Sequence, residues 1–150
     1  MKQDKPLSEE QIKTLIRAAL RARKKAYAPY SHYQVGAALL SAGGEIFPGC
    51  NVENASFGAT ICAERAAFVS AIAQGKKRFA AIAIVAGPDD ADARALASLN
   101  YPTPCGICRQ FMREFTDPDR FQIILARSAG DYVVCSLDDL LPASFGPESL

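Results

Sequence analysis

The sequence predicts a three-layer α/β/α sandwich built on a mixed β-sheet of about five strands. Short apolar, strand-like segments alternate with helical segments, an order that favours right-handed crossovers and helices on both faces of one sheet. The chain has 150 residues, of which 49% are hydrophobic, so a core can form without disulfide bonds. We therefore expect residues 1–150 to fold as a single domain.

An amphipathic helix is expected first, over residues 9–25. Ser8 and Gln11 have the spacing of a capping box, and apolar residues then recur every three or four positions. A proline soon after this segment ends the helical pattern, because proline forces an extended backbone on its predecessor. A β-hairpin follows, with strands over residues 34–41 and 45–52 joined by two glycines that suit a tight turn.

The second half of the chain continues with helices and buried strands. Residues 62–74 are rich in Ala and precede Gly75, which suits the end of a helix. Continuous apolar runs indicate strands that are covered on both faces. The remaining elements are expected as strands at residues 79–86, 121–126 and 132–135 and as helices at residues 105–115 and 137–141.

Composition and charge exclude several classes of protein. The formal net charge is +1, and basic residues gather only in short clusters, at residues 21–25 and 76–78, which we expect to be solvated. A nucleic-acid binder would carry a basic stripe with interleaved aromatic residues, and the sequence has none. No apolar run is long enough to cross a bilayer, and the amino terminus does not resemble a signal peptide. We expect a cytoplasmic protein without a membrane or nucleic-acid partner.

The strongest chemical signal is a set of three cysteines and one acid. Cys62 with Glu64, and Cys105 with Cys108, fall at the amino termini of two expected helices. Free N–H groups and the positive helix pole favour ionised thiolates there, the form that binds zinc. Three protein ligands with an open fourth position indicate a catalytic zinc site, beside which Glu64 can move protons.

The cysteine and histidine residues allow other interpretations. Cys105 and Cys108 alone would also fit a structural zinc knuckle or a redox pair, but neither interpretation explains Cys62 and Glu64. The other two cysteines, Cys50 and Cys135, are expected to be buried small residues without chemistry. The only histidine, His32, is expected at the surface or beside the site and not on the metal.

Motifs along nearly the whole chain match one family. They are Pro29–Tyr33 (PYSHY), Val35–Ala38 (VGAA), Asn51–Ala55 (NVENA), Cys62–Arg65 (CAER), Pro104–Gly106 (PCG), Cys108–Gln110 (CRQ), Leu140–Pro142 (LLP) and Ser144–Pro147 (SFGP). With these motifs the chain resembles the small cytidine deaminases. The resemblance implies one zinc ion per chain, held by Cys62, Cys105 and Cys108. It also implies a homotetramer whose active sites are completed by neighbouring subunits, with Phe57 and Phe145 as candidates for contacts between subunits.

The resemblance also implies the reaction. Members of this family convert cytidine and 2′-deoxycytidine to the corresponding uridines by hydrolysis, with release of ammonia, in pyrimidine salvage. A hydroxide on the zinc attacks C4 of the base, and Glu64 carries protons from the attacking water to N3 and to the leaving amine.

Several substrate contacts are implied in the same way. Asn51 and Glu53 correspond to the pair that hydrogen-bonds the ribose hydroxyls, and strand residues two apart share a face. The backbone N–H of Ala63 would donate to the base carbonyl. Arg65 would donate to the zinc thiolates and offset their excess negative charge.

Two features depart from the family pattern. Tyr33 stands where Phe is common, and its ring could still stack near the nucleoside, but its hydroxyl needs a partner. The stretch between Val85 and Pro104 is longer than the usual family connection by roughly ten residues, a length typical of a surface insertion. We expect a loop with a helical turn there, which would alter access to the pocket if it lies nearby.

The sequence leaves three alternative functions open. A deaminase of a related nucleoside such as blasticidin S would use the same chemistry, although Asn51, Glu53 and the CAER motif favour cytidine. A binding scaffold would hold zinc for stability without turnover. A deaminase that acts on polynucleotides is opposed by the near-neutral charge of the chain.

Overall fold

Strands from both halves of the chain combine into a mixed sheet. The computed structural model describes residues 5–150, and the strand order in its sheet is β2-β1-β3-β4-β5. The strands are β1 (Tyr33–Ser41), β2 (Ile46–Cys50), β3 (Phe79–Pro88), β4 (Gln122–Ser128) and β5 (Asp131–Ser136). β3 and β4 run parallel, whereas the other neighbouring pairs are antiparallel. The predicted α/β class with a mixed sheet of about five strands is confirmed.

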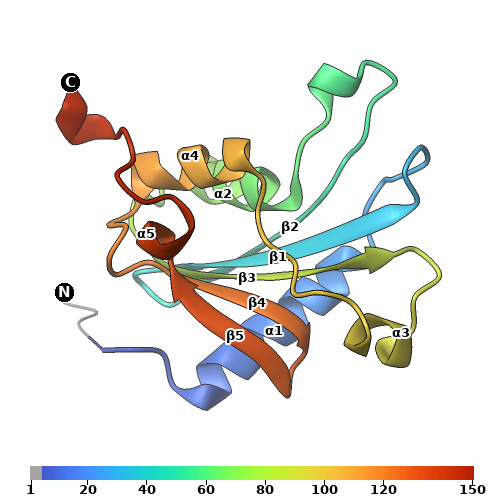
Figure 1. Ribbon diagram of the computed structural model, residues 1–150. Coiled ribbons are helices and arrows are strands. Elements are labelled where there is room, and N and C mark those ends of the chain that lie inside the picture. Colours follow the sequence, from blue (N-terminus) through green and yellow to red (C-terminus); the bar gives the residue numbers. More distant parts are fainter. Residues whose placement is uncertain (1–4) are drawn as a thin grey trace.

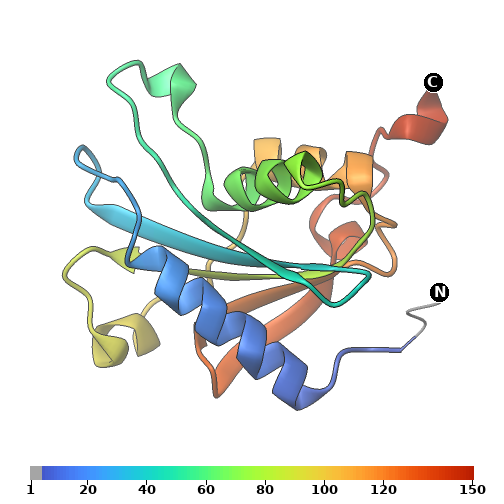
Figure 2. The same cartoon turned by 180° about the vertical axis from the view of Figure 1, so that it is seen from behind.

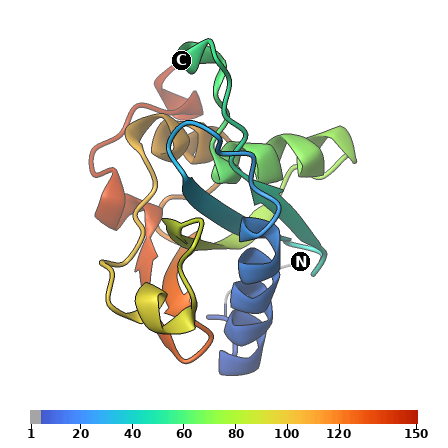
Figure 3. The same ribbon diagram turned by 90° about the vertical axis from the view of Figure 1, so that its right-hand side faces the viewer.

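Helices cover both faces of this sheet and complete three layers, as Figure 1 and the reverse view in Figure 2 show. One face carries α1 (Glu9–Arg23) and the short α3 (Ala93–Ala97), and the other carries α2 (Ala63–Ala73), α4 (Gly106–Phe115) and α5 (Leu137–Leu140). Figure 3 shows the sheet edge-on between α1 and the pair α2 and α4. Two 3₁₀ turns, η1 (Phe57–Ala59) and η2 (Pro147–Ser149), project from these layers. Within residues 5–150, no helix combines the length and the apolar character that crossing a bilayer requires.

Alternation along the strands sends side chains into two cores. On β1, Ala37 and Leu39 belong to the core under α2 and α4, whereas Ala38 and Leu40 belong to the core under α1. β3 is buried along almost its whole length, as expected for a strand covered on both faces. The sheet therefore holds α2 and α4 side by side on one face, and cysteine residues lie at the N-termini of both helices.

Local signals at the helix ends act as predicted. Ser8 Oγ accepts a hydrogen bond from Gln11 N–H at 3.2 Å, and Gln11 Oε1 accepts one from Ser8 N–H at 2.9 Å, which completes the capping box. Gly75 has a φ of +85°, the left-handed conformation that ends many helices. α1 ends at Arg23 instead of residue 25, because Lys25 N–H bonds to a carbonyl only three residues back and tightens the last turn.

The strands begin and end differently from the prediction. β2 ends at Cys50 instead of residue 52, because Val52 leaves the sheet and pairs with Tyr27 and Ile61. β3, β4 and β5 extend beyond the apolar runs that predicted them. Backbone pairing with the neighbouring strand continues past the last apolar residue in each case.

One basic residue that was expected to be solvated is instead buried. Arg23, at the end of α1, is only 4% exposed. Its Nη2 donates to the carbonyl of Gly87 at 3.1 Å and also to the carbonyl of Pro88. The end of α1 is thereby tied to the end of β3, a contact between residues far apart in the sequence that charge pattern alone could not indicate.

Gly36 lets α1 lie directly on β1. A Cβ at this position would lie 2.0 Å from the Ala19 carbonyl oxygen and 2.4 Å from Arg23 N, both in the backbone of α1. Gly36→Ala should therefore lower the free energy of unfolding by about 3 kcal/mol, because a helix backbone cannot move aside as a flexible side chain can. Urea unfolding measures the change, with Gly58→Ala as control, since a Cβ at Gly58 would meet nothing within 4 Å. Equal unfolding midpoints for the two variants would contradict this close contact.

Candidate active site

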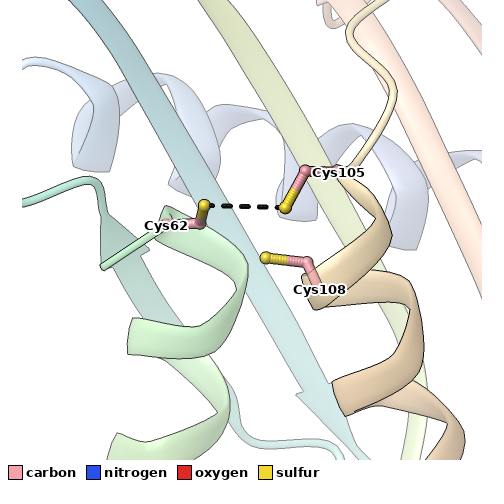
Figure 4. Close-up of side chains that lie close together, drawn as sticks. All are labelled: Cys62, Cys105 and Cys108. Carbon is pink, nitrogen blue, oxygen red and sulfur yellow. Dashed lines mark hydrogen bonds between the residues drawn. The ribbon is translucent and has the colours of Figure 1, made fainter. Parts of the chain in front are cut away.

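Three cysteine sulfur atoms converge between the N-termini of α2 and α4 (Figure 4). Cys62 is the N-cap of α2, Cys105 is the N-cap of α4, and Cys108 lies in the first turn of α4. Their Sγ atoms all lie within 4.8 Å of one another. Among residues 5–150, no other group of three or more His, Cys, Asp or Glu residues is placed to hold a metal ion.

The two helix ends favour negatively charged sulfur. Neither Cys62 nor Cys105 makes the side-chain hydrogen bond that would cap its helix. The first-turn N–H groups, and the positive ends of both helix dipoles, therefore act on the sulfur cluster. Such an environment stabilises thiolates, the form in which cysteine binds a metal.

The sulfur spacing fits a tetrahedral zinc ion. Cys62 Sγ and Cys105 Sγ lie 3.8 Å apart, far beyond the disulfide bond length of about 2.05 Å. Two sulfurs that each bind one tetrahedral zinc at about 2.3 Å would themselves be about 3.8 Å apart. All five cysteines are free thiols. Three thiolate ligands leave one of the four coordination positions of zinc for water or substrate.

The thiols and the Glu64 carboxyl group lie so close together that a negative charge on one opposes ionisation of the others. Hydrogen bonding from Cys108, together with donation from Arg65 and Cys105, lowers the pKa of Cys62 to about 5. The pKa of Cys108 is raised, because its thiol donates to Cys62 and because burial and Glu64 oppose a second negative charge. A divalent cation at the centre would offset this repulsion and let all three sulfurs ionise. The chemistry of the donor set therefore fits a bound cation.

Arg65 supplies positive charge beside the sulfurs. Its Nη2 donates to Cys62 Sγ at 3.6 Å. Its Nε is buried and has no hydrogen-bond partner within the described part of the chain. The pKa of Arg65 is raised, chiefly by the hydrogen bond to Cys62. A guanidinium here reduces the net negative charge that three thiolates leave on a divalent ion.

Glu64 lies beside the sulfur cluster without being one of its three members. It is the second residue of α2 and is only 4% exposed. Burial raises the pKa of its carboxyl group above the ordinary value. The residue lines a cavity that Cys62 and Cys105 also line. A carboxyl group in this place can accept a proton from one atom of a bound molecule and return it to another.

The cavity beside the cluster has a volume of about 550 Å³, within the usual range of small-molecule sites. Val35, Ile84 and Ala86, from β1 and β3, form an apolar part of its lining. Residues 99–103, from the segment between α3 and α4, form another part. Among the described residues, Glu64 is the only acidic side chain in the lining, and no Lys, Arg or His lines it.

Comparison with known proteins decides the family. A family model for the cytidine and deoxycytidylate deaminase zinc-binding region matches residues 9–124. The chain belongs to this deaminase family. A probable cytidine deaminase of Dictyostelium discoideum is 39% identical over 144 residues, covering 96% of this chain and 90% of the relative. A cytidine deaminase of Halalkalibacterium halodurans is 41% identical over 137 residues, covering 91% of this chain and 95% of the relative.

Solved structures of deaminases share the fold. The crystal structure of cytidine deaminase from Burkholderia pseudomallei matches with a TM-score of 0.77 at 47% identity, covering 88% of this chain and 97% of that chain. The structure of cytidine deaminase from Mycobacterium tuberculosis matches with a TM-score of 0.72 at 36% identity, covering 89% and 95%. The zinc-binding family and the cluster of Cys62, Cys105 and Cys108 together fit one zinc ion per chain.

The deaminase fold places Asn51 in the cavity lining. Asn51 is 8% exposed, its Oδ1 accepts a hydrogen bond from Val35 N–H at 2.8 Å, and its Nδ2 donates to the Tyr33 carbonyl at 2.8 Å. A side-chain amide has two N–H donors, so one is left to bind a ligand after Tyr33 has taken the other. Tyr33 lines the same cavity.

Glu53 lies in the loop after β2 and accepts hydrogen bonds from the loop before β1. β2 ends at Cys50, so Asn51 and Glu53 both lie beyond the strand and the two-residue alternation does not apply to them. Glu53 is outside the cavity lining within residues 5–150, and its Oε1 accepts hydrogen bonds from the N–H groups of Tyr30 at 2.9 Å and Ser31 at 3.1 Å. Donation from Ser31 and Tyr30 lowers the pKa of Glu53.

The two phenylalanines considered for subunit contacts lie on the surface. Phe57 is 76% exposed and Phe145 is 59% exposed, and neither lines the cavity in the described chain. The Phe57 ring packs edge-on against Tyr30, with 5.9 Å between the ring centroids. The Phe145 carbonyl accepts a hydrogen bond from Gln110 Nε2 at 3.1 Å. Both rings are therefore accessible to another subunit.

The remaining candidate residues lie outside the sulfur cluster. His32 is at the surface, where its Nδ1 lies 3.0 Å from Asp89 Oδ2. Cys50 and Cys135 are half-buried, not fully buried as expected, because they belong to β2 and β5, the two edge strands of the sheet.

Sequence reasoning missed one part of the cavity. Residues 99–103 line it, yet the sequence indicated only a long connection of unknown position. The available signal was the length of this connection. Its path could not be predicted, because it depends on contacts with residues distant in the sequence.

Proposed function

We propose that the protein is a zinc-dependent cytidine deaminase, which converts cytidine and 2′-deoxycytidine to uridine and 2′-deoxyuridine and releases ammonia. The observation that carries this proposal is the buried Glu64 beside three convergent cysteines, of which Cys62 and Cys105 line the same cavity as Glu64. The names of the relatives, probable cytidine deaminase and cytidine deaminase, support the choice of substrate.

The zinc ion would be held by Cys62, Cys105 and Cys108. When bound, zinc acts as a Lewis acid that lowers the pKa of a bound water to about 7, so that a nucleophile is available in neutral solution. Arg65 donates to Cys62 Sγ and reduces the negative charge of the thiolates. This matters because three uncompensated thiolates would make the water a weaker acid.

Glu64 moves the protons of the reaction in this proposal. A water oxygen adds to C4 of the cytosine ring, and Glu64 transfers one proton of that water to N3. Glu64 then takes the second proton from the new C4 hydroxyl and gives it to the amino group. The C4–N4 bond breaks, ammonia leaves and the uracil carbonyl remains. Burial raises the pKa of Glu64, which suits a carboxyl group that holds a proton between two transfers.

Other residues of the site orient the nucleoside. The second amide N–H of Asn51 donates to a ribose hydroxyl, and the Tyr33 ring stacks near the nucleoside. Ala63 is the first residue of α2, and an N–H at that position has no partner inside the helix, so it can donate to the base carbonyl. Glu53 would reach the ribose with its second carboxylate oxygen, because the first is engaged by loop N–H groups.

The cavity favours a nucleoside over a nucleotide. Phosphate binding uses Arg, Lys or clustered N–H donors, and the described lining contains no basic side chain. The same feature, with the net charge of +1, opposes a polynucleotide substrate. A zinc-stabilised scaffold would not need a buried carboxyl group beside the metal site.

The proposal extends to assembly and location. A homotetramer, with Phe57 and Phe145 in contact with neighbouring subunits, is supported by the exposure of both rings. A cytoplasmic role in pyrimidine salvage is supported by five free thiols, which a reducing compartment preserves. One deaminase domain over residues 1–150 is supported by the common sheet that joins all named strands.

Purified protein with about one zinc per chain should convert cytidine to uridine and should turn over cytidine 5′-monophosphate at least about a hundredfold more slowly. The reason is that the described cavity would leave the phosphate charge without a cationic partner. The change in ultraviolet absorbance on deamination measures both rates. Equal turnover of the monophosphate would contradict the nucleoside assignment. Turnover of blasticidin S alone would favour the antibiotic deaminase, and full zinc content with no turnover would favour the scaffold.

A further inference from the structure

The segment between β3 and α4 contributes a wall to the cavity. It leaves β3 at Pro88, forms α3 and returns to the N-terminus of α4, as Figure 1 shows. Residues 99–103 of this segment line the cavity, and we call them the cavity wall. Three of them, Leu99, Tyr101 and Pro102, present apolar surface.

Contacts between residues far apart in the sequence hold this segment in place. At its start, Arg23 Nη2 donates to the Gly87 carbonyl at 3.1 Å. Leu96 of α3 is buried, and a Cβ on Gly87 would lie 2.4 Å from Leu96 Cδ2 and 3.1 Å from Leu99 Cδ1. A mobile surface loop has few buried contacts of this kind. The segment is therefore a fixed part of the fold.

Polar side chains join the cavity wall to the hairpin of β4 and β5. Tyr101 Oη donates to Asp131 Oδ1 at 2.6 Å. Arg127 donates from Nε to Asp131 Oδ2 at 2.9 Å, from Nη1 to the Leu99 carbonyl at 3.0 Å and from Nη2 to Tyr101 Oη at 3.2 Å. Arg127 Cζ also lies 4.3 Å from the centroid of the Tyr101 ring, a favourable cation–π distance. Neither Arg127 nor Asp131 lines the cavity, so Tyr101 stands between the cavity and the hairpin.

The hairpin of β4 and β5 is irregular at Arg127, the residue that contacts Tyr101. The pairing of β4 with β5 shifts between Ala126 and Ser128, which places Arg127 at a β-bulge. A bulge turns a side chain out of the regular alternation of a strand. Donation from Arg127 and Tyr101 lowers the pKa of Asp131, so its carboxylate stays ionised and keeps both bonds.

We propose that Tyr101 sets the upper size of the nucleoside that the cavity admits, and that Arg127 and Asp131 are positioning residues that hold it. This inference rests on the proposed function and deepens it. Leu99 packs near the end of β3, where Pro88 pairs with Tyr33, whereas Thr103 lies two residues before Cys105. Tyr101 therefore lies between the Tyr33 end and the cysteine end of the cavity. A fixed ring there excludes substituents that a shorter or looser side chain would admit.

Removing the Tyr101 ring tests the size limit. Tyr101→Ala should raise the ratio of kcat/KM for an enlarged substrate to kcat/KM for cytidine by about tenfold, because small differences in fit are worth that much in a closed pocket. Two probes are used, 5-bromocytidine with a larger base and 2′-O-methylcytidine with a larger sugar. A gain for at least one supports the proposal. An unchanged ratio for both, in a folded variant with full zinc content, would overturn it.

Loosening Tyr101 without removing its ring tests the positioning residues. Tyr101→Phe and Asp131→Ala should each raise KM for cytidine about fivefold and change kcat less than about twofold, because the anchor acts on binding and not on proton transfer. The effects on KM should not add in the double variant, since each substitution removes the hydrogen bond between Tyr101 and Asp131. Additive effects on KM, or no effect, would show that Asp131 does not act through Tyr101.

Matched controls separate this proposal from general damage and from the proposed function. Tyr132→Phe removes a hydroxyl from the neighbouring hairpin position, and Arg94→Gln removes a charge from the exposed side of α3; neither residue lines the cavity. Both controls should keep the KM of the unchanged protein. Cytidine turnover by the unchanged protein is measured first. If that is absent, the proposed function fails, whereas normal turnover with unaltered size selection in the Tyr101 variants overturns the cavity-wall proposal alone.

Discussion

Replacing Glu64 with Gln should lower kcat for cytidine about a thousandfold while zinc content stays near one ion per chain. Gln has the size of Glu and can occupy the same buried position, which is only 4% exposed in this protein. It cannot take a proton from water and return it to N3 or to the leaving amine, and such transfers contribute on the order of a hundredfold to ten-thousandfold to catalysis. Steady-state kinetics and a zinc assay on the same sample measure the two quantities.

The control for this substitution is Glu114→Gln. Glu114 lies on the exposed side of α4, so the change removes the same charge from a position in the same layer that does not line the cavity. Its kcat should stay within about twofold of the unchanged protein, as for ordinary surface substitutions. A Glu64→Gln variant that keeps more than about a tenth of kcat would remove Glu64 from the proton-transfer role. Loss of zinc along with activity would instead assign Glu64 to the metal site.

The metal centre could be predicted from sequence because its parts depend on local structure. Cys62 and Cys105 each precede a segment with clear helical pattern, and Gly75 marks the end of the first of these helices. The N-cap position then follows from sequence, and with it the environment that favours a thiolate. That the two helix ends meet was suggested by the family resemblance and not by the pattern of either helix.

Features that depend on contacts between distant residues could not be predicted. Arg23 was expected to be solvated with its basic neighbours, yet it is buried and donates to carbonyl groups at the end of β3. Glu53 seemed to share a strand face with Asn51, but the strand ends before both, since Val52 pairs outside the sheet. In each case the local pattern could not reveal a contact between residues that are far apart in the sequence.

The position of the cavity wall also depends on contacts between distant residues and could not be predicted from the sequence. Apolar periodicity is weak between Pro88 and Thr103, so the sequence indicated no more than a helical turn in a long connection. The structure orders this connection through Arg127 at a β-bulge and through the buried Leu96 of α3. Neither the β-bulge at Arg127 nor the burial of Leu96 has a short-range sequence signature. A connection of unusual length in a known family is therefore best tested as part of the binding site.

Replacing Cys108 with Ser should reduce zinc content from about one ion per chain to less than about a tenth, abolish deamination and lower Tm by about 10 °C. Cys108 is fully buried and joins the first turn of α4 to Cys62 at the start of α2. A serine hydroxyl does not ionise near neutral pH, so the site keeps two thiolates and loses most of its affinity for zinc. Because bound zinc stabilises the folded state by mass action, its loss also destabilises the protein.

Cys135→Ser is the matched control, because Cys135 is a half-buried thiol on β5 outside the sulfur cluster. It should keep full zinc content and activity. Treating the unchanged protein with a strong chelator should reproduce the fall in Tm of the Cys108→Ser variant, and the chelator should not lower the Tm of that variant further. A further fall would mean that the metal is held elsewhere. Together these results would separate the effect of the metal from the cost of burying a hydroxyl group, which only the variant incurs.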